Sequence, residues 1–558
     1  MMIRFGKRKL VLAAVAGASV FALGLTGCAA QGGSAGTESS RVLNVYAGSQ
    51  TPIVANFNPF APTVLHGALG PIYEPLFFYN KTAAEPPVGL LGESFEFSED
   101  GTSLTIKLKE GIKWNDGKPF TAEDVAYTYN FELSKRAYLK NAEAIDDTTV
   151  ELQFNEPSFT NEFQILGSAL MIPKHIWESV DNPQEWPNEA PVGTGPYVVK
   201  SVSDAAYLLE ANENFRTEGV PAVKEVRYLG IDSNGSAADL MKAGKIDWQQ
   251  LFSPDPESLT AAGVVSYINT PQDPTVLYTC ANADLGCTGP QTDVAVRQAL
   301  NVAIDRGVIT EKAFVGLAAA ISPTFALLGR DDKWIGEGQP EESPQSADAA
   351  EVASILEGAG YSKGADGFFG KNGTPIELSL TSVDGWTDYN DAARLIQEQA
   401  AAAGIKVVAT TVSWNEFSDA RQGGNFQLIM GGVVGTSVAD PYQIYKDWFT
   451  TVSTTPVGEI LVPGTWNFSR YSNPVVDAAV LAASETNDEA AKLAAYSTIQ
   501  TEIVRDLPYI PLVINASQTF MNTKDFTGWP SEDNLYAFPP SWGAVAGGYV
   551  LQQLKPAK

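Results

Sequence analysis

Histidine and cysteine are scarce in this sequence, which limits the chemistry that it can carry. Among 558 residues there are only two histidines, His66 and His175, and three cysteines, Cys28, Cys280 and Cys287. Neither histidine is near a cysteine in the sequence, so no group has the spacing of a metal site. Nucleophiles paired with a base at catalytic spacing are missing too. We therefore expect no cofactor, no metal and no enzymatic activity.

Positive charge is also in short supply. Lysine and arginine number 37 against 65 aspartates and glutamates, which gives a formal net charge of -28 at pH 7. Such a surface repels nucleic acid and anionic lipid headgroups, so neither is expected as a partner. Hydrophobic residues make up 44% of the chain, enough for folded cores. The length is too great for one core, so two or three lobes are expected.

Only one apolar run is long enough to concern a membrane, and it lies at the N-terminus. Residues 10–25 are apolar, follow four basic residues, and lead into Leu-Thr-Gly-Cys ending at Cys28. This pattern is typical of a secretory signal, and the final cysteine resembles a bacterial lipobox. The prediction is a signal peptide at 1–27, removed so that Cys28 carries the lipid. A plain transmembrane anchor is the alternative, although 16 residues are few for a span.

The segment after Cys28 is small and polar, AAQGGSAGTESS, and predicts a flexible tether over residues 28–41. About 13 such residues reach roughly 20 Å. The expected location is the cell surface, lipid-anchored to the outer face of the cytoplasmic membrane. The protein is expected to work as a monomer.

Period-two alternation predicts a strand near residue 103 that leads into a helix. Leu104, Ile106 and Leu108 alternate with polar residues, so one face of the strand is apolar. Thr121, followed three residues later by Asp124, predicts a helix N-terminus. No chemistry is visible around this module.

The second half of the chain alternates strand and helix patterns. PIELSL (375–380) predicts a strand, DAARLIQEQAAAAG (391–404) a helix, and IKVVATTVSW (405–414) a second strand. FQLIMGG (426–432) predicts a buried strand. This order predicts an α/β fold with a largely parallel sheet and flanking helices.

Cys280 and Cys287 stand in the short segment CANADLGC. Outside the cell a disulfide between them is allowed. An eight-residue loop would contribute about 2–2.5 kcal/mol by the chain-entropy estimate. Two free buried thiols are the alternative.

Several segments taken in order resemble one family, the extracellular solute-binding proteins of ABC importers, family 5, of the oligopeptide- and dipeptide-binding type. The resemblance implies a two-lobed periplasmic-binding-protein-like clamp of mixed sheets that closes on a ligand and docks on ABC permease subunits. The segments are IYEPLFFYN (72–80), EDGTSLTIKLKEGIKWNDGKPFTAEDVAYTYN (99–130), MIPKHIW (171–177), PVGTGPYVV (191–199), LMKAGKID (240–247), VRQALNVAID (296–305), ILEGAGY (355–361) and LPYIPL (507–512).

The resemblance also implies a division of the chain into lobes. The core of the first lobe is expected from residues 42–75, 190–272 and 516–558, an extra domain on it from 76–189, and the second lobe from 273–515.

In peptide-binding members of this family an aspartate in a G-W-x-x-D-x-x-(D/E)-P segment pairs with the α-amino group of the peptide. The matching stretch here is GGVVGTSVADP (431–441). Aligned on Asp440 and Pro441, the position of that aspartate holds Ser437, and the tryptophan is replaced by valine. An amine buried without a carboxylate would be costly. The departure therefore favours a neutral oligosaccharide over an oligopeptide or dipeptide, which stays as the alternative.

Oligosaccharide-binding members, such as the cellobiose type, use aromatic platforms and amide or carboxylate side chains. ANFNPF (55–60) and IYEPLFFYN resemble the early loops of that subgroup. Trp386 follows a predicted strand, where a parallel sheet presents ligand loops. Trp414 and Trp542 are further aromatic candidates. The predicted ligand-binding residues are Asn56, Asn58, Tyr73, Trp386, Ser437, Asp440, Trp448 and Trp466.

Two other classes of function remain as alternatives. An exported glycoside hydrolase would need two carboxylates across a cleft, and with 65 acidic residues the sequence cannot exclude such a pair. A peptide-sensing surface receptor would share the fold and differ only in its partner.

Overall fold

The computed structural model describes residues 41–48, 51–61, 63–270, 273–433, 438–461 and 465–557, without the side chains of residues 414 and 415. Cys28, Ser437 and the predicted signal peptide lie outside the described residues. Within them, no helix combines the length and the apolar character that crossing a bilayer requires. Three main sheets, each with its own helices, organise this part of the chain.

A mixed seven-stranded sheet contains strands from both ends of the described chain, in the order β12-β21-β11-β1-β10-β9-β8. The central strand β1 pairs in parallel with β10 and β11, while the other neighbours are antiparallel. The strands are β1 (Leu43–Tyr46), β8 (Tyr197–Val202), β9 (Ala206–Ala211), β10 (Glu225–Leu229), β11 (Trp248–Gln250), β12 (Val265–Asn269) and β21 (Gln518–Asn522). The helices that accompany it are α4 (Asn234–Lys242), α5 (Glu257–Thr260) and α14 (Val545–Gln553).

A five-stranded sheet has the order β18-β17-β19-β13-β20. Its strands are β13 (Asp273–Thr279), β17 (Glu377–Val383), β18 (Lys406–Val412), β19 (Leu428–Gly432) and β20 (Tyr509–Asn515). Its helices are α6 (Val294–Ala303), α7 (Arg306–Lys312), α8 (Ala349–Gly358), α9 (Thr387–Ala403), α10 (Trp414–Gly423), α11 (Tyr442–Phe449), α12 (Pro474–Ser484) and α13 (Glu489–Asp506).

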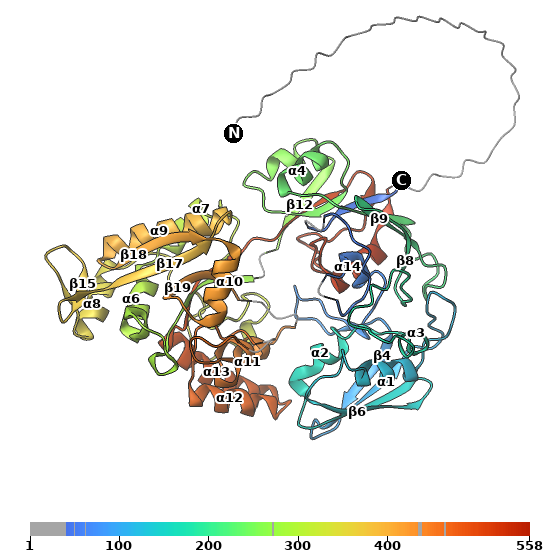
Figure 1. The fold of residues 1–558 in the computed structure, drawn as a ribbon, viewed down its shortest axis with the longest axis horizontal. Helices are drawn as coiled ribbons and strands as arrows, with labels where there is room; N and C mark the ends of the chain where they lie inside the picture. The colour runs from blue at the N-terminus through green and yellow to red at the C-terminus, as the bar shows by residue number, and fades with distance from the viewer. Residues whose placement is uncertain are drawn as a thin grey trace, which may run out of the picture. The chain divides into compact units, whose positions relative to one another are not determined.

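The predicted strand–helix–strand unit is confirmed in this sheet. β17 pairs in parallel with β18, and α9 connects them and lies against both (Figure 1). The buried face of α9 carries Ala392, Ile396 and Ala400 at helical spacing, and the helix ends where Gly404 adopts a left-handed conformation (φ 89°). The predicted α/β class with mixed sheets is therefore correct, and β13 and β20 make the sheet less parallel than expected.

A smaller antiparallel sheet has the order β4-β5-β7-β6. None of its strands pairs with a strand of the other two sheets. The predicted alternation is confirmed, since Leu104, Ile106 and Leu108 are buried in its core. The predicted helix start is also confirmed, because Asp124 accepts a hydrogen bond from the backbone N–H of Thr121 at 3.1 Å. The elements are β4 (Gly92–Phe97), β5 (Ser103–Leu108), β6 (Leu139–Asp146), β7 (Thr149–Phe154), α1 (Ala122–Asn130), α2 (Glu162–Leu166) and α3 (Lys174–Trp177).

Short strands and single turns of 3₁₀ helix complete the described chain. The strands are β2 (Phe77–Phe78), β3 (Val88–Gly89), β14 (Ser362–Lys363), β15 (Phe369–Lys371), β16 (Thr374–Pro375), β22 (Phe526–Thr527) and β23 (Lys555–Pro556). The 3₁₀ turns are η1 (His66–Ala68), η2 (Phe159–Asn161), η3 (Ala283–Leu285), η4 (Pro290–Thr292), η5 (Asp332–Trp334) and η6 (Thr451–Ser453). Cys280 and Cys287 are joined by a disulfide, with their Cα atoms 5.4 Å apart.

Each main sheet has a hydrophobic core of its own. The five-stranded sheet is buried on both faces: along β13, Leu277 belongs to one cluster, while Val276 and Tyr278 belong to another. The seven-stranded and four-stranded sheets pack separate clusters. Since the large sheets have independent cores, each can keep its packing if the other moves.

The chain passes twice between the two large sheets, from β12 to β13 and from β20 to β21. The two passages are hydrogen-bonded to each other: Thr270 N–H donates to the carbonyl of Ser517 at 3.0 Å, and Ser517 N–H donates to Asn269 Oδ1 at 3.1 Å. These paired passages, called the crossings below, are short and offer few backbone dihedrals that could change.

Candidate ligand-binding site

Polar side chains gather where strands of the five-stranded sheet end beside the crossings. β17 and β19 are parallel, so the loops that follow them leave from the same edge of the sheet. The loop after β17 carries Asp388 and Tyr389 at the start of α9. The Tyr389 and Thr275 hydroxyls are 3.0 Å apart, and Asn515 Nδ2 donates to Asp388 Oδ2 at 3.4 Å. This edge thus carries a half-buried carboxylate and an amide next to the crossings, with the fully buried Thr275 hydroxyl behind them.

The carboxylate of Asp388 is half-buried and has no cationic partner among the described residues. Burial raises its pKa, while hydrogen bonds from the backbone of Tyr389 and from Asn515 act in the opposite direction. A desolvated carboxylate without a counterion is unfavourable in the free protein. An arriving ammonium group would therefore gain more here than at an exposed aspartate.

A lysine faces this region from the side of the seven-stranded sheet. Lys81 is held there because its neighbours Asn80 and Thr82 both donate to the carbonyl of Leu535, at 2.7 and 3.0 Å. Its ammonium nitrogen lies 3.9 Å from the centroid of the Phe538 ring. No carboxylate of the described residues lies within ion-pair distance of this nitrogen, and burial lowers the pKa of Lys81, while nearby Asp273 raises it.

Arg330 joins the two sides close to Lys81. Its guanidinium is bound to the neighbouring Asp331 by two hydrogen bonds of 2.7 Å each, and Nη1 donates to the carbonyl of Lys81 at 2.8 Å. Between Lys81, Asp273 and Arg330 there remains a cavity of about 10 Å³, the space of one water molecule. Asp273 acts electrostatically on both Lys81 and Tyr389, which places these charged and polar groups in one region.

A second contact between the two sides involves α2. Gln164 Nε2 donates to Gln443 Oε1 at 2.9 Å. Burial raises the pKa of Glu162 on the same helix, whereas the Tyr79 hydroxyl, which donates to it at 2.8 Å, and the charge of Lys492 act in the opposite direction. Lys492 belongs to α13, so α2 interacts with the five-stranded side at more than one residue.

Three of the predicted ligand-binding residues lie buried in cores in the structure. Asn58 is fully buried, and its amide nitrogen donates to the carbonyls of Pro183 and Trp186. Tyr73 is fully buried with its hydroxyl bound to Asn188, and Trp448 lies within the aromatic cluster under β13. These side chains are engaged within the fold, so the structure gives no support for ligand contact by them.

Two further predicted residues serve local structure. Asn56 donates to the hydroxyl of Thr63 at 3.0 Å and shapes the early loop. Asp440 accepts from the Tyr496 hydroxyl at 2.6 Å and from the backbone of Tyr442, and Lys492 lies 3.5 Å away. Both oxygens of Asp440 are thus engaged by groups of the fold itself.

The remaining tryptophans differ in their surroundings. Trp386 is half-buried beside Asp388 and has Tyr389 and Phe417 edge-on at 5.4 Å each. Trp466 is half-buried and stacks on Trp448, 6.2 Å between centroids. Trp542 donates its indole N–H to Gln250 at 2.8 Å. The Trp414 side chain and Ser437 lie outside the described residues.

Asp388, Lys81 and Asn515 were not predicted from the sequence. Asp388 stands two residues after Trp386, so the strand-end argument that selected the tryptophan applied to it equally. Lys81 directly follows the IYEPLFFYN segment. No sequence signal, however, indicates that Phe538, more than 450 residues away, would cover the lysine.

The family model and the similar proteins point to the same family. The family described as bacterial extracellular solute-binding proteins, family 5 Middle, matches residues 86–455. Protein XP55 of Streptomyces lividans is 28% identical over 524 residues, covering 90% of this chain and 89% of the relative. The oligopeptide-binding protein AppA of Bacillus subtilis is 27% identical over 492 residues, covering 83% and 85%.

Among solved structures, the periplasmic oligopeptide-binding protein of an oligopeptide ABC transporter from Thermotoga maritima is similar throughout. Its structure with mannohexaose bound has a TM-score of 0.77 and 26% identity, covering 93% of this chain and 99% of that chain. A second structure of the same protein has a TM-score of 0.83 over 93% and 100% of the two chains.

Proposed function

The chain belongs to the bacterial extracellular solute-binding proteins of family 5, and from this premise we propose that its ligand is a short peptide. It is a substrate-binding protein of an ABC importer, which acts on the outer side of the membrane together with ABC permeases. The family serves transport rather than catalysis. The names of relatives such as AppA support a peptide over the neutral oligosaccharide that the sequence favoured.

The observation that carries the proposal is a pair of unpaired charges of opposite sign beside the crossings. Asp388 offers a half-buried carboxylate from the side of the five-stranded sheet, and Lys81 offers a desolvated ammonium group from the other side. A peptide is a zwitterion, with an amine for Asp388 and a carboxylate for Lys81. A neutral sugar would leave both charges desolvated and uncompensated, which is costly.

Asp388 takes the role that the sequence could not assign to Ser437. Its place at the edge where β17 and β19 end allows a ligand amine to meet a carboxylate that Asn515 holds in position. Charge-assisted hydrogen bonds of this kind are about twice as strong as neutral ones.

Ligand capture is proposed to shift the two large sheets toward each other as separate lobes. In the part of the chain that the structure describes, the backbone passes between them at the two crossings, and each lobe keeps its own core. A peptide that touches Asp388 and Lys81 at once gains both interactions only in the closed form, and this difference in binding free energy drives closure.

A second candidate ligand is an oligosaccharide. The similar protein from Thermotoga maritima has mannohexaose bound, and Trp386 offers an indole next to Asp388 that could stack on a sugar face. This candidate predicts binding that is independent of charge at Asp388 and Lys81.

Anchoring by a lipid on Cys28, after removal of residues 1–27, remains part of the proposal, as does action as a monomer. The lipid anchor rests on the sequence pattern at the N-terminus. Mass spectrometry of the membrane-extracted protein would detect the lipidated N-terminal peptide, and a Cys28→Ser variant is expected in the medium.

The test is calorimetric titration of the purified protein with a panel of short peptides and with mannohexaose. Free peptides should bind, and acetylation of their amine should weaken binding at least tenfold in the wild type. Asp388→Asn should bind both peptide forms with similar, weak affinity. Asp391→Asn is the matched control, because Asp391 lies one turn further along α9, half-exposed and paired with Arg394.

Strong binding of mannohexaose without any peptide binding would replace the peptide proposal by the second candidate. Cleavage of either ligand during the titration would instead favour the exported hydrolase.

A further inference from the structure

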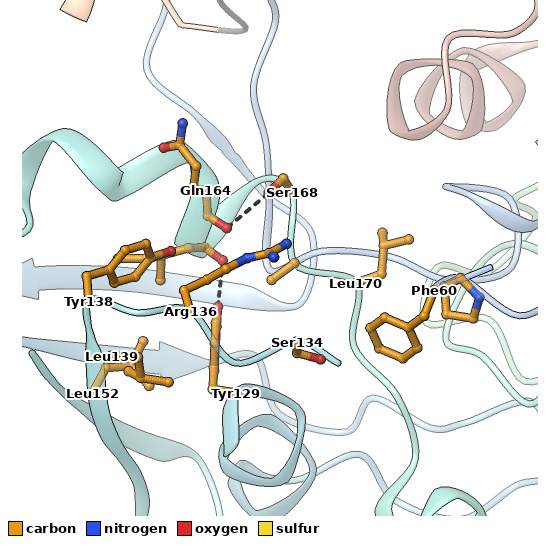
Figure 2. Close-up of a pocket in the computed structure, with 13 residues that line it drawn as sticks. Phe60, Tyr129, Ser134, Arg136, Tyr138, Leu139, Leu152, Gln164, Ser168 and Leu170 are labelled. Atoms are coloured by element: carbon orange, nitrogen blue, oxygen red, sulfur yellow. Dashed lines mark hydrogen bonds between the residues drawn. The ribbon is translucent and has the colours of Figure 1, made fainter. Parts of the chain in front are cut away.

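A separate pocket lies between the four-stranded sheet and the segment around Phe60. It has a volume of about 120 Å³, and all of its lining residues come from positions 59–170 (Figure 2). None of them belongs to the Asp388 and Lys81 region or to the five-stranded sheet. The pocket is thus built within one part of the chain, and its lining residue Gln164 also donates to Gln443 of the five-stranded side.

The pocket contains polar groups that have no partner among the described residues. The guanidinium of Arg136 makes no ion pair and no hydrogen bond there, and it extends across the pocket in Figure 2. The Ser134 hydroxyl oxygen is buried and accepts or donates no hydrogen bond. Burial raises the pKa of Tyr138 to about 12, while the charge of Arg136 acts in the opposite direction, so the phenol and the guanidinium are close.

The charge of this pocket is unusual for the protein as a whole. The sequence carries 65 acidic residues, yet no aspartate or glutamate lines the pocket, and Arg136 is its only charged side chain. Arg136 is solvent-exposed at the wall of this pocket, and a lone cation at a concave surface of a strongly acidic protein favours an anion there.

Most of the remaining lining is apolar, so the part of the ligand that is not charged is expected to be apolar too. The space is too small for a drug-sized molecule or a peptide segment. Two hydroxyl groups of the lining already donate to backbone carbonyls. The Tyr129 hydroxyl donates to Ile165 at 2.6 Å, and the Ser168 hydroxyl donates to Gln164 at 3.0 Å. The apolar lining consists of Pro59, Phe60, Leu139, Leu152, Ile165, Ala169 and Leu170.

We propose that this pocket binds a small monocarboxylate with an apolar body, such as a short aliphatic or phenyl-substituted acid. The carboxylate accepts two hydrogen bonds from the Arg136 guanidinium and one from the Ser134 hydroxyl. The apolar body packs against Phe60, Leu139 and Leu170. Arginine suits this task because its planar fork matches both oxygens of a carboxylate.

The carboxylate could belong to a free acid or to the end of a captured peptide. The separation of the pocket from Asp388 and Lys81 favours the free acid. A simple acid tested without peptide distinguishes the two sources, because only a free acid site is saturated by it.

The experiment is ligand-observed NMR titration of the full protein with phenylacetate, and with phenylacetamide as the neutral match. Phenylacetate should give saturable binding, and phenylacetamide should bind at least tenfold more weakly. Arg136→Gln should weaken phenylacetate binding at least tenfold. Lys135→Gln removes the same charge from the adjacent exposed residue and should change binding less than twofold.

Arg136 makes no contact that the fold needs among the described residues, so the melting temperature of Arg136→Gln should match that of the wild type. Equal binding of the acid and the amide, equal binding by Arg136→Gln and wild type, or no saturable binding at all would each overturn the proposal. Peptide binding at Asp388 is measured separately, so its failure would leave this result unaffected.

Discussion

The carboxylate of Asp124, on the helix α1 beside the four-stranded sheet, and the charged groups around the crossings are used in opposite ways. The buried carboxylate of Asp124 accepts from the backbone of Thr121, from the Trp114 indole and from the backbone of Lys174, at 3.0 to 3.2 Å. Around the crossings, Asp388 and Lys81 are desolvated but have no partner of opposite charge in contact among the described residues. The Asp124 carboxylate contributes to stability, whereas the charges of Asp388 and Lys81 remain available to a ligand.

The difference also concerns where the partners come from. The partners of Asp124 lie within 50 residues of it in the sequence. The groups around the crossings come from residue 81, from the 273–275 and 386–389 segments and from residues 515 and 538. The contacts of Asp124 are local, whereas the binding region exists only when distant segments meet.

The largest effect is expected from a change in the core of the four-stranded sheet. Ile106→Ala removes a fully buried side chain and should lower the free energy of unfolding by about 2–5 kcal/mol. Urea unfolding followed by circular dichroism measures this change, and peptide affinity should stay the same in native buffer. Lys107→Ala, the exposed neighbour, should change stability by at most about 0.5 kcal/mol. An unchanged unfolding midpoint for Ile106→Ala would show that this core does not contribute the expected stability.

The next effect concerns binding rather than stability. Lys81→Met removes the ammonium group while keeping the contact with Phe538, and should weaken peptide binding by about 1.5–3 kcal/mol. Its melting temperature should equal or exceed that of the wild type, because a desolvated charge is lost. Amidated peptides should bind the variant and the wild type equally well in titration calorimetry. A large fall in melting temperature with unchanged affinity would assign Lys81 to the fold.

A pH titration tests whether the Asp388 carboxylate contacts the ligand. Its folded-state pKa is raised above the ordinary 3.8, so the ionised form is disfavoured by folding. Its contribution to stability is therefore most favourable at low pH and is lost as the pH rises through the raised value. Peptide affinity needs the ionised form, so it should fall as the pH drops through that same value.

Affinity measured by fluorescence between about pH 7 and pH 4 should follow this course in the wild type and lose this component in Asp388→Asn. Asp388→Asn should also be at least as stable as the wild type at neutral pH. Identical pH profiles for the two proteins would exclude Asp388 from the ligand contact.

The smallest effect is expected at the contact between α2 and the five-stranded side. Gln164→Ala removes one neutral hydrogen bond to Gln443, worth about 0.5–1.5 kcal/mol. Affinity should fall a few-fold and the melting temperature should barely change. Ser168→Ala, on the adjacent turn, is the matched control with no bond to the other side. A fall of a hundredfold in Gln164→Ala would mean that this helix contacts the ligand directly.

Much of the fold could be predicted from periodicity. The alternation of Leu104, Ile106 and Leu108 predicted a strand with one buried face. The apolar spacing of residues 391–404 predicted the helix between β17 and β18. Both patterns depend on contacts of a residue with its own element, which sequence spacing encodes directly. Element boundaries and the antiparallel pairing of β13 depend on other segments and were not predicted.

The residues that the structure brings together at the candidate site differ from most of the predicted ones for a physical reason. Asn58 and Tyr73 have the residue types that bind sugars, yet the same hydrogen-bonding groups serve equally well to join Asn58 to Pro183 and Tyr73 to Asn188. Residue type gives a side chain its capacity to bind, and the fold decides what it binds. Trp386 was selected by its place after a strand, and it is the predicted residue that lies next to Asp388.

The order of amino acids alone determined the α/β class, the strands and helices with clear periods, the family and the strongly acidic surface, because each follows from neighbouring residues or from simple sums. Only the tertiary structure decided which charges stay without partners. Whether a lysine is neutralised, stacked on a ring or left free depends on groups hundreds of residues away, and those groups meet it only after the chain has folded.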